Sequence, residues 1–523
     1  MSVRHRAAWT TALATSALLI TTATARANVT LTQLSTDPFT NSTSQHATEV
    51  EPDTFSFGST IVSAFQVGRF TDGGGSDIGW ATSTDSGATW THGFLPGITQ
   101  WQGGGSFQRV SDASVAYDAA HNTWLISSIP ITSTVTVPSV VVSRSTDGGL
   151  TWSNPVTVTT FADAGLDKNW SVCDDTATSP FYGHCYTEFD DNGDSNREYM
   201  STSTDGGLTW GPAMRTANNA TGIGGQPVVQ PNGTVVVPVD NANETSLLAF
   251  TSANGGASWS ATTTVTSIKS HTEGGGLRSG PLPTAEIDAS GKVYVAWSDC
   301  RFRSGCHAND LVFTTSTNGT SWTAVTRVPI DATNSGVDHF LPGLAVDRST
   351  SGSSAHLGLT YYFYPVSSCS ASTCQLDVGF VSSPNGGASW TTSTQLAGPM
   401  SLSWLPSTTQ GPMVGDYIST SYAGGTAHGV FEVASAPSGG VLNQASYSPA
   451  SGLARTLTPN PGFNTSALTP AGLDRPVPGA QSDHPAATVA LTSRSTELDQ
   501  AARGVRGAAA NRRQEIPGFA GRR

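Results

Sequence analysis

The sequence has few charged residues, because Asp, Glu, Lys and Arg together make up 12% of its 523 positions. Helical proteins rely on Glu, Lys, Leu and Ala, so this composition, with 56 Gly, argues against an all-α fold. No stretch between residues 28 and 435 shows a sustained helical period. Basic residues are also scarce: 25 Lys and Arg stand against 38 Asp and Glu, a net charge of −13, which argues against a nucleic-acid binder.

Long apolar runs are missing after the N-terminus, so we expect no membrane span. Residues 1–27 have the pattern of a secretory signal peptide: Arg4 and Arg6 precede an apolar stretch, and Ala-Arg-Ala at 25–27 gives a small-x-small cleavage pattern. The alternative is a membrane anchor, but the stretch is rich in Thr and shorter than the ~20 residues of a spanning helix. The sequence therefore predicts a secreted, extracellular protein.

The six cysteines lack the CxxC spacing and the histidine partners that zinc sites prefer. Six cysteines suit an oxidising compartment, which agrees with export. They fall into three near pairs along the chain, and pairing within each is the simplest prediction. The predicted disulfides are Cys173–Cys185, Cys300–Cys306 and Cys369–Cys374.

One short motif recurs six times, at intervals of about 60 residues, and such periods indicate stacked repeats or propellers. Its clearest form is Ser-Thr-Asp-Gly-Gly-Leu-Thr-Trp, at 145–152 and again at 203–210. Asp or Asn can accept backbone N–H bonds across a turn, and Gly can adopt the positive φ that a hairpin needs. Because Asn replaces Asp freely, we interpret the third residue as structural. The six third residues are Asp85, Asp147, Asp205, Asn254, Asn318 and Asn385.

Each repeat holds four short strand-like segments, which is the composition of one propeller blade. We predict an all-β propeller over 51–435 with six such blades. Strand-like runs at 414–422 and 429–435, joined by the alternating run 28–34, would form a seventh, composite blade that closes the ring. Six and seven blades both remain open. Residues 28–50 form an N-terminal segment, and residues 436–523, rich in Ala, Pro, Ser and Gly, a flexible tail.

The repeated S-x-D-x-G-x-T-W string resembles the Asp-box, or BNR repeat, of sialidases and related β-propellers, whose sialidases have six blades. In that family the box joins the third and fourth strands of a blade. The resemblance thus places all the box turns on one face. The second-to-third loops and the starts of the innermost strands then lie on the opposite face, where we expect the binding site.

The resemblance also implies a chemistry, in which three arginines hold the substrate carboxylate and a tyrosine activated by Glu is the nucleophile. Tyr417 matches the tyrosine, Asp72 (or Asp77) the acid/base, and Glu273 (or Glu286) the activating group. The first inner strand, EPDTFSFG, lacks the first arginine of the family, so the set of three is incomplete. The predicted substrate-binding residues are Arg69, Arg109, Asp112, Asp167, Arg278, Arg301, Arg303 and Asp416.

Asp190, Asn192 and Asp194 have the D-x-N-x-D spacing that begins a calcium loop. Ser195 stands where the loop needs Gly, and no Glu occupies the twelfth position, so Ca²⁺ is an expectation from spacing alone.

The first functional hypothesis is a secreted, sialidase-like glycoside hydrolase. The alternative is a non-catalytic propeller that binds a glycan or a protein at the cell surface.

Overall fold

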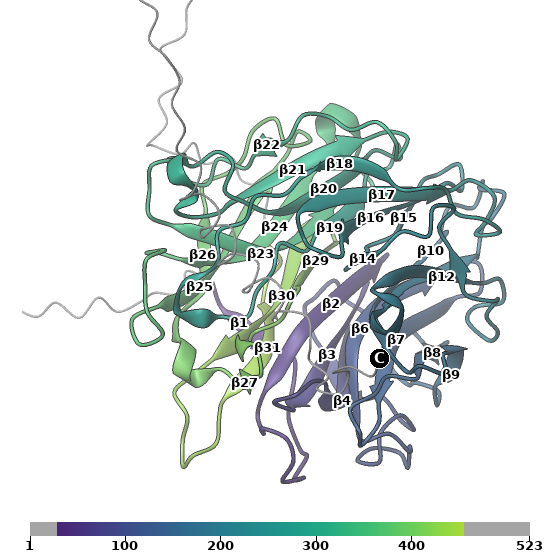
Figure 1. Cartoon of the computed structure of the whole chain (residues 1–523), viewed down its shortest axis with the longest axis horizontal. Helices are drawn as coiled ribbons and strands as arrows, with labels where there is room; N and C mark the ends of the chain where they lie inside the picture. The colour runs from purple at the N-terminus through teal and green to yellow at the C-terminus, as the bar shows by residue number, and fades with distance from the viewer. Residues whose placement is uncertain (1–28, 454–523) are drawn as a thin grey trace, which may run out of the picture.

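The computed structural model describes residues 29–453, which fold almost entirely into antiparallel β-sheets (Figure 1). The sheets follow one another along the chain, each with its first strand innermost, and this confirms the all-β propeller. The strands of the first three blades are β2 (Glu49–Phe57), β3 (Thr60–Arg69), β4 (Gly75–Ser83) and β5 (Thr91–Phe94); β6 (Arg109–Asp118), β7 (Thr123–Ile131), β8 (Ser139–Ser145) and β9 (Val156–Thr160); and β10 (Leu166–Cys173), β11 (Cys185–Asp191), β12 (Arg197–Ser203) and β13 (Met214–Arg215).

The next three blades repeat this order, except that the first strand of the fourth blade is broken into two pieces, both paired with β16. Their strands are β14 (Gly222–Ile223), β15 (Val228–Val229), β16 (Val235–Asn241), β17 (Ser246–Ser252) and β18 (Thr263–Ser267); β19 (Thr284–Ile287), β20 (Val293–Asp299), β21 (Asp310–Ser316) and β22 (Thr326–Arg327); and β23 (Asp338–Val346), β24 (Leu357–Tyr364), β25 (Gln375–Ser383) and β26 (Thr394–Ser401).

Only short pieces interrupt this pattern in the described residues. A small hairpin, β27 (Ser407–Thr408) and β28 (Gly411–Pro412), precedes the last blade. Five single-turn 3₁₀ helices lie in loops: η1 (Asn192–Asp194), η2 (Gly274–Gly276), η3 (Ser304–Cys306), η4 (Gly352–Ser354) and η5 (Leu402–Trp404). No helix in the described range is long and apolar enough to cross a membrane.

A seventh blade joins the two ends of the described chain. It contains β29 (Ser419–Ala423), β30 (Thr426–Ala434), β31 (Gln444–Pro449) and, outermost, β1 (Leu31–Gln33), which pairs antiparallel with β31. The innermost strands contact one another around the ring, and β29 contacts both β23 and β2. The ring therefore has seven blades rather than six, and the composite closing blade is confirmed.

The blade boundaries extend past those expected from the sequence. β31 lies beyond residue 435, where the sequence predicts a tail; five of its six residues are buried, and it pairs with β30 on one side and β1 on the other. The predicted signal peptide at 1–27 and the remainder of the predicted tail, 454–523, lie outside the described residues.

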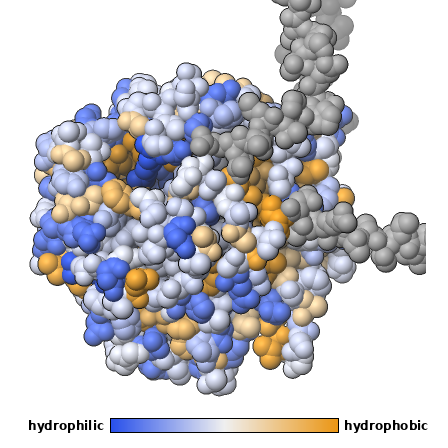
Figure 2. Space-filling model, turned by 180° about the vertical axis from the view of Figure 1, so that it is seen from behind, coloured by the Kyte–Doolittle hydropathy of each residue, from blue (hydrophilic) through white to orange (hydrophobic). Residues whose placement is uncertain are grey.

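Polar and apolar residues are interspersed over the face shown in Figure 2, as is usual for a surface in water.

The box turns are structural, as their recurrence predicts. Asp205 accepts the backbone N–H of Thr209 at 2.9 Å with one carboxylate oxygen and the Thr209 hydroxyl at 2.6 Å with the other. Asn385 accepts the N–H of Ser389 at 2.8 Å in the same way, which explains why Asn can replace Asp. The boxes therefore stabilise hairpins rather than supply catalytic groups.

The three predicted disulfides are all present. Cys173–Cys185 joins the two innermost strands of the third blade, while Cys300–Cys306 and Cys369–Cys374 each close a loop between the second and third strands of a blade. The described residues contain no free cysteine.

Closure of the ring depends on the residue that follows β1. Leu34 is fully buried against Phe65, Val67 and Val430, and its N–H donates to Ser446 O at 2.8 Å. Replacing Leu34 with Ala is expected to lower the free energy of unfolding by about 2–4 kcal/mol, because it leaves a cavity where the first and seventh blades meet. Urea denaturation measures the loss, and the exposed Thr30→Ala on the same segment is the control. Equal stability of the two variants would show that β1 is not needed for closure.

Candidate functional site

Backbone bulges near the starts of three inner strands turn charged residues toward the axis of the ring. The strand register shifts at Glu51 in β2, at Asp112 in β6 and at Lys168 in β10. All three residues have positive φ, at 57°, 52° and 35°. A bulge re-aims a side chain, and strained backbone of this kind gathers at functional sites. The bulges bring a lysine and two carboxylates from three blades together.

Lys168 forms the centre of this cluster. Its ammonium lies 3.2 Å from Asp112 Oδ1, 3.6 Å from Glu51 Oε1 and 4.1 Å from the centroid of the Tyr417 ring. All four side chains are buried. Because a buried charge is tolerated only when it is paired, the lysine and the two carboxylates depend on one another.

A second ion pair stands beside the first. Arg278, in the loop between β18 and β19, donates through Nε to Asp416 Oδ1 at 2.9 Å and through Nη2 to Asp416 Oδ2. The backbone N–H of Arg278 also donates to Pro412 O at 2.9 Å, which fixes its loop against the β27–β28 hairpin. The N–H of Asp416 faces Glu51 Oε1 at 3.3 Å, so Glu51 links the two pairs.

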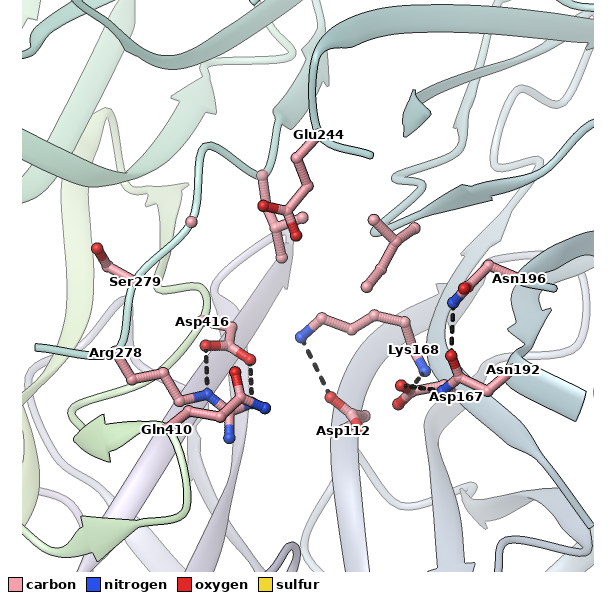
Figure 3. A pocket seen from close by; sticks show the side chains of 13 residues that line it. Asp112, Asp167, Lys168, Asn192, Asn196, Glu244, Arg278, Ser279, Gln410 and Asp416 are labelled. Carbon is pink, nitrogen blue, oxygen red and sulfur yellow. Dashed lines mark hydrogen bonds and ion pairs between the residues drawn. The ribbon is translucent and has the colours of Figure 1, made fainter. Parts of the chain in front are cut away.

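Four of these residues, Asp112, Lys168, Arg278 and Asp416, line one open pocket at the mouth of the ring, which we call the charged mouth (Figure 3). The lining comes from the starts of inner strands and from second-to-third loops, on the face opposite the box turns, as predicted. Its polar lining residues are Asp112, Asp167, Lys168, Asn192, Asn196, Glu244, Arg278, Ser279, Gln410 and Asp416.

The carboxyl groups of the mouth have different acidities. Burial, assisted by the nearby Asp112, raises the pKa of Asp167 to about 6. Burial raises the pKa of Glu51 to about 7, although Lys168 acts against it. Burial alone would also raise the pKa of Asp416, but Arg278 and Lys168 hold it well below its usual value. Carboxyl groups whose pKa values are pushed apart suit acid and base roles in one site.

Tyr417, the predicted nucleophile, is buried beneath this pocket rather than presented to it. Its hydroxyl donates to Ala113 O at 3.3 Å, and its ring packs edge-on against Trp170 at 5.2 Å between centroids. Burial, and then the charges of Glu51 and Asp112, raise the pKa of the phenol. This environment disfavours a phenolate, which the predicted chemistry would need.

Two other predicted residues and their partners support the mouth from behind or beside it. Arg69 is fully buried and donates to Gln66 Oε1 at 2.9 Å. Gln66 in turn donates to Glu51, so Arg69 lies behind the cluster. Arg109 forms an ion pair with Asp72, the predicted acid/base, and donates to Gly73 O at 3.3 Å. Neither Arg109 nor Asp72 lines the charged mouth.

Three further predicted residues do not reach the mouth. Arg301 pairs with Asp299 at 2.7 Å, and Arg303 pairs with Asp310 at 2.7 Å. Both lie in the β20–β21 loop that the Cys300–Cys306 disulfide closes, and these local partners hold them in the fifth blade. Glu273 accepts a hydrogen bond from Asn309 Nδ2 at 3.0 Å and does not line the charged mouth. These predictions of substrate contact and activation are not supported by the geometry.

The predicted calcium loop does not bring its three side chains together. Asp190 accepts from Asn196 Nδ2 at 2.7 Å, and Asn192 donates to Asp167 Oδ2 at 2.7 Å. Asp194 pairs instead with Arg197 at 3.3 Å and with Arg215 at 3.1 Å.

Within the described residues, one group has metal-ligand atoms close together, Asp310, Asp331 and His339, whose atoms lie within 4.8 Å of one another. Arg303 and Arg327 pair with both of its carboxylates, at 2.6–2.8 Å. Two guanidinium groups already neutralise these carboxylates, so the group fits a structural ion-pair cluster better than a cation site.

The predicted substrate-binding residues leave out six polar residues of the mouth: Lys168, Asn192, Asn196, Glu244, Ser279 and Gln410. Asn196 and Glu244 lie in the β11–β12 and β16–β17 loops, whose face the repeat pattern already indicated. Asn192 was predicted as a calcium ligand and lines the pocket instead. Gln410 lies between β27 and β28, in a hairpin for which the repeats give no signal.

A wider hollow of about 550 Å³ opens at the other end of the axis, on the face of the box turns. The ends of the inner strands line it, including Phe55 and Arg348. Arg348 is held against Glu286 at 3.2 Å and over the Phe55 ring at 4.6 Å. The charged mouth, although smaller, contains the strained residues and the carboxyl groups of unequal pKa, so we assign the candidate site to it.

Part of the repeat region is similar to a known family. Residues 139–343 match the model of the BNR repeat-like domain. No curated protein matches the chain.

Several solved structures resemble the fold at low identity. A protein of unknown function from Dyadobacter fermentans is 14% identical with a TM-score of 0.44, over 68% of this chain and 99% of that one. An ulvan lyase is 10% identical with a TM-score of 0.46, over 80% and 95%. The Hadza microbial sialidase Hz136 is 18% identical with a TM-score of 0.41, over 61% and 64%. Residues 139–343 are therefore similar to a BNR repeat-like domain, in agreement with the resemblance that the six Asp-boxes indicate.

Proposed function

We propose that the protein is an extracellular glycoside hydrolase that acts on a glycan bound at the charged mouth. The observation that supports this proposal is the convergence of Asp112, Asp167, Lys168, Arg278 and Asp416 on one open pocket from distant parts of the chain. An open polar pocket at a propeller mouth suits a sugar chain, whose hydroxyl groups need donors and acceptors. The three disulfides favour an oxidising compartment and agree with the predicted export.

Two carboxyl groups suffice for the chemistry. Asp167, with its pKa raised to about 6, carries a proton at mildly acidic pH and is placed to give it to the glycosidic oxygen. Asp112, whose Oδ1 lies 3.2 Å from the Lys168 ammonium, stabilises positive charge at the anomeric carbon or takes a proton from the attacking water. Water then adds to the anomeric carbon as the sugar leaving group departs.

The tyrosine route of sialidases fits this site less well. It needs a phenol facing the substrate and three arginines around the substrate carboxylate. The hydroxyl of Tyr417 is directed to Ala113 O, and Arg301 lies in the fifth blade with Asp299. Arg278 and the buried Arg69 are the two arginines near the cluster, and each already has partners.

One pair of variants separates the two routes. Asp167→Asn is expected to lower kcat by ~10²–10⁴-fold, because it removes the proton donor, whereas Tyr417→Phe is expected to stay within about threefold of the parent protein. Reducing sugar released from a panel of neutral, basic and acidic glycans measures both.

The matched control is Asp205→Asn, because Asn stands at that box position in the last three repeats. Loss of turnover in Tyr417→Phe, with Asp167→Asn active, would establish the tyrosine route instead. If the parent protein bound glycans but released no sugar from any of them, the non-catalytic binding propeller would be the correct function.

A further inference from the structure

The charged mouth is acidic despite its lysine and arginine. Four carboxyl groups line it against two cations, so the lining carries a net negative charge when all are ionised. The acidic lining residues are Asp112, Asp167, Glu244 and Asp416, and the basic ones are Lys168 and Arg278. Glu51 and Asp190 add further carboxyl groups directly behind the lining.

Both cations of the mouth are already engaged by carboxylates. Arg278 holds Asp416 through two nitrogens, and Lys168 lies between Asp112 and Glu51. A substrate carboxylate would therefore meet cations whose charge the neighbouring carboxylates already balance. The mouth is therefore poorly suited to a sugar acid.

Glu244 makes the outer part of the mouth acidic as well. It lies in the turn between β16 and β17, where its N–H donates to Asn241 O at 2.7 Å and its φ is 53°. Its carboxylate points into the pocket above Lys168 and Asp416 (Figure 3). Asp167 faces the same space from the third blade. The Glu244 carboxylate suits a positively charged group on the ligand, because hydrogen bonds from an ammonium to a carboxylate are among the strong ones.

The surrounding propeller has the same sign of charge. Residues 29–453 contain 33 Asp and Glu against 13 Lys and Arg. An acidic cleft in an acidic protein raises the local concentration of cations and attracts cationic ligands at low salt.

Resting on the proposed function, we propose that the glycan bound at the charged mouth is built from amino sugars with free, protonated amines, and that Glu244 receives those amines. Neutral sugars would bind through the same hydroxyl contacts without this gain, and sugar acids would be repelled.

Calorimetric titration of the full-length protein with matched hexamers tests the inference. The ligands are glucosamine, N-acetylglucosamine and galacturonate hexamers with sulfur linkages, so that binding is measured without turnover. At mildly acidic pH and low salt, the glucosamine hexamer is expected to bind at least about tenfold more tightly than the N-acetylated one. The preference is expected to shrink as salt is added.

Two variants that remove the same charge from opposite faces provide the control. Glu244→Gln is expected to reduce the preference for the amine at least about threefold, with little change for the N-acetylated hexamer. Asp205→Asn, in a box turn on the far face, is expected to leave the preference unchanged. Equal losses in the two variants, or equal or tighter binding of either other hexamer, would overturn the inference. The result is independent of hydrolysis: amine-selective binding without sugar release contradicts only the proposed catalysis, whereas turnover of sugar acids contradicts only the amine preference.

Discussion

Raising the pH from 5 to 8 is expected to lower the free energy of unfolding by several kcal/mol. Burial raises the pKa of Asp53 to about 7 and those of Glu198 and Glu432 to about 8. Between pH ~4 and these values the folded protein holds protons that the unfolded chain has released, so stability is greatest at the acidic end and falls as pH rises. A shift of three pKa units in one group corresponds to ~4 kcal/mol.

Urea denaturation at a series of pH values measures how the free energy of unfolding changes with pH. Glu432 is a useful probe because it lies fully buried in β30 and accepts one hydrogen bond, from Ser446 Oγ at 2.8 Å. Glu432→Gln is expected to reduce the loss between pH 5 and 8 by about 2–4 kcal/mol, because the amide does not ionise. Stability that increased from pH 5 to 8 would show that these carboxyl groups are ionised and well solvated in the folded protein.

Replacing Lys168 with Met is expected to cost about 3–5 kcal/mol of stability at neutral pH, although the two side chains have similar length. The substitution leaves Asp112 and Glu51 facing one another in a buried site without their cation. The pKa of Glu51, which Lys168 lowers against the effect of burial, is expected to rise further.

Asp112→Asn, added to Lys168→Met, tests this explanation. Removing one of the two anions is expected to recover part of the lost stability, because less charge remains unpaired. Lys292→Met is the control, since Lys292 lies over the Tyr294 ring at 4.8 Å in the fifth blade and is not part of the mouth. A loss below about 1 kcal/mol for Lys168→Met would mean that water reaches the cluster.

Much of the fold could be predicted because the motif repeats. The box fixes one turn per blade, the turn fixes the direction of its two strands, and the direction fixes the face on which every other loop lies. Only the closure of the ring needed the structure: the run 28–34 was a candidate, but β31 at 444–449 lies in a segment whose Ala, Pro, Ser and Gly resemble a linker.

The site could be predicted less fully. The position of a loop in the repeat indicates on which face of the propeller its residues lie, but not which side chains they contact. Asp112, Asp167, Arg278 and Asp416 were all predicted on one face, and all four line the charged mouth. Arg301 shares that face, yet Asp299, two residues away, pairs with it locally. The inward turns of Glu51, Asp112 and Lys168 come from single-residue bulges, which leave the alternating pattern of a strand almost unchanged.

The seventh blade cannot be completed until its third strand, β31, has been synthesised. β1 emerges first from the ribosome, but its partner β31 is more than four hundred residues away, and until residue 449 has emerged β1 has no neighbour in its sheet. Through that interval the apolar side of Leu34 and the unpaired edge of β1 stay accessible to chaperones and to a translocation channel. A chain that is exported before it folds does not expose the unpaired β1 inside the cell, because β1 and β31 then pair only after both have crossed the membrane.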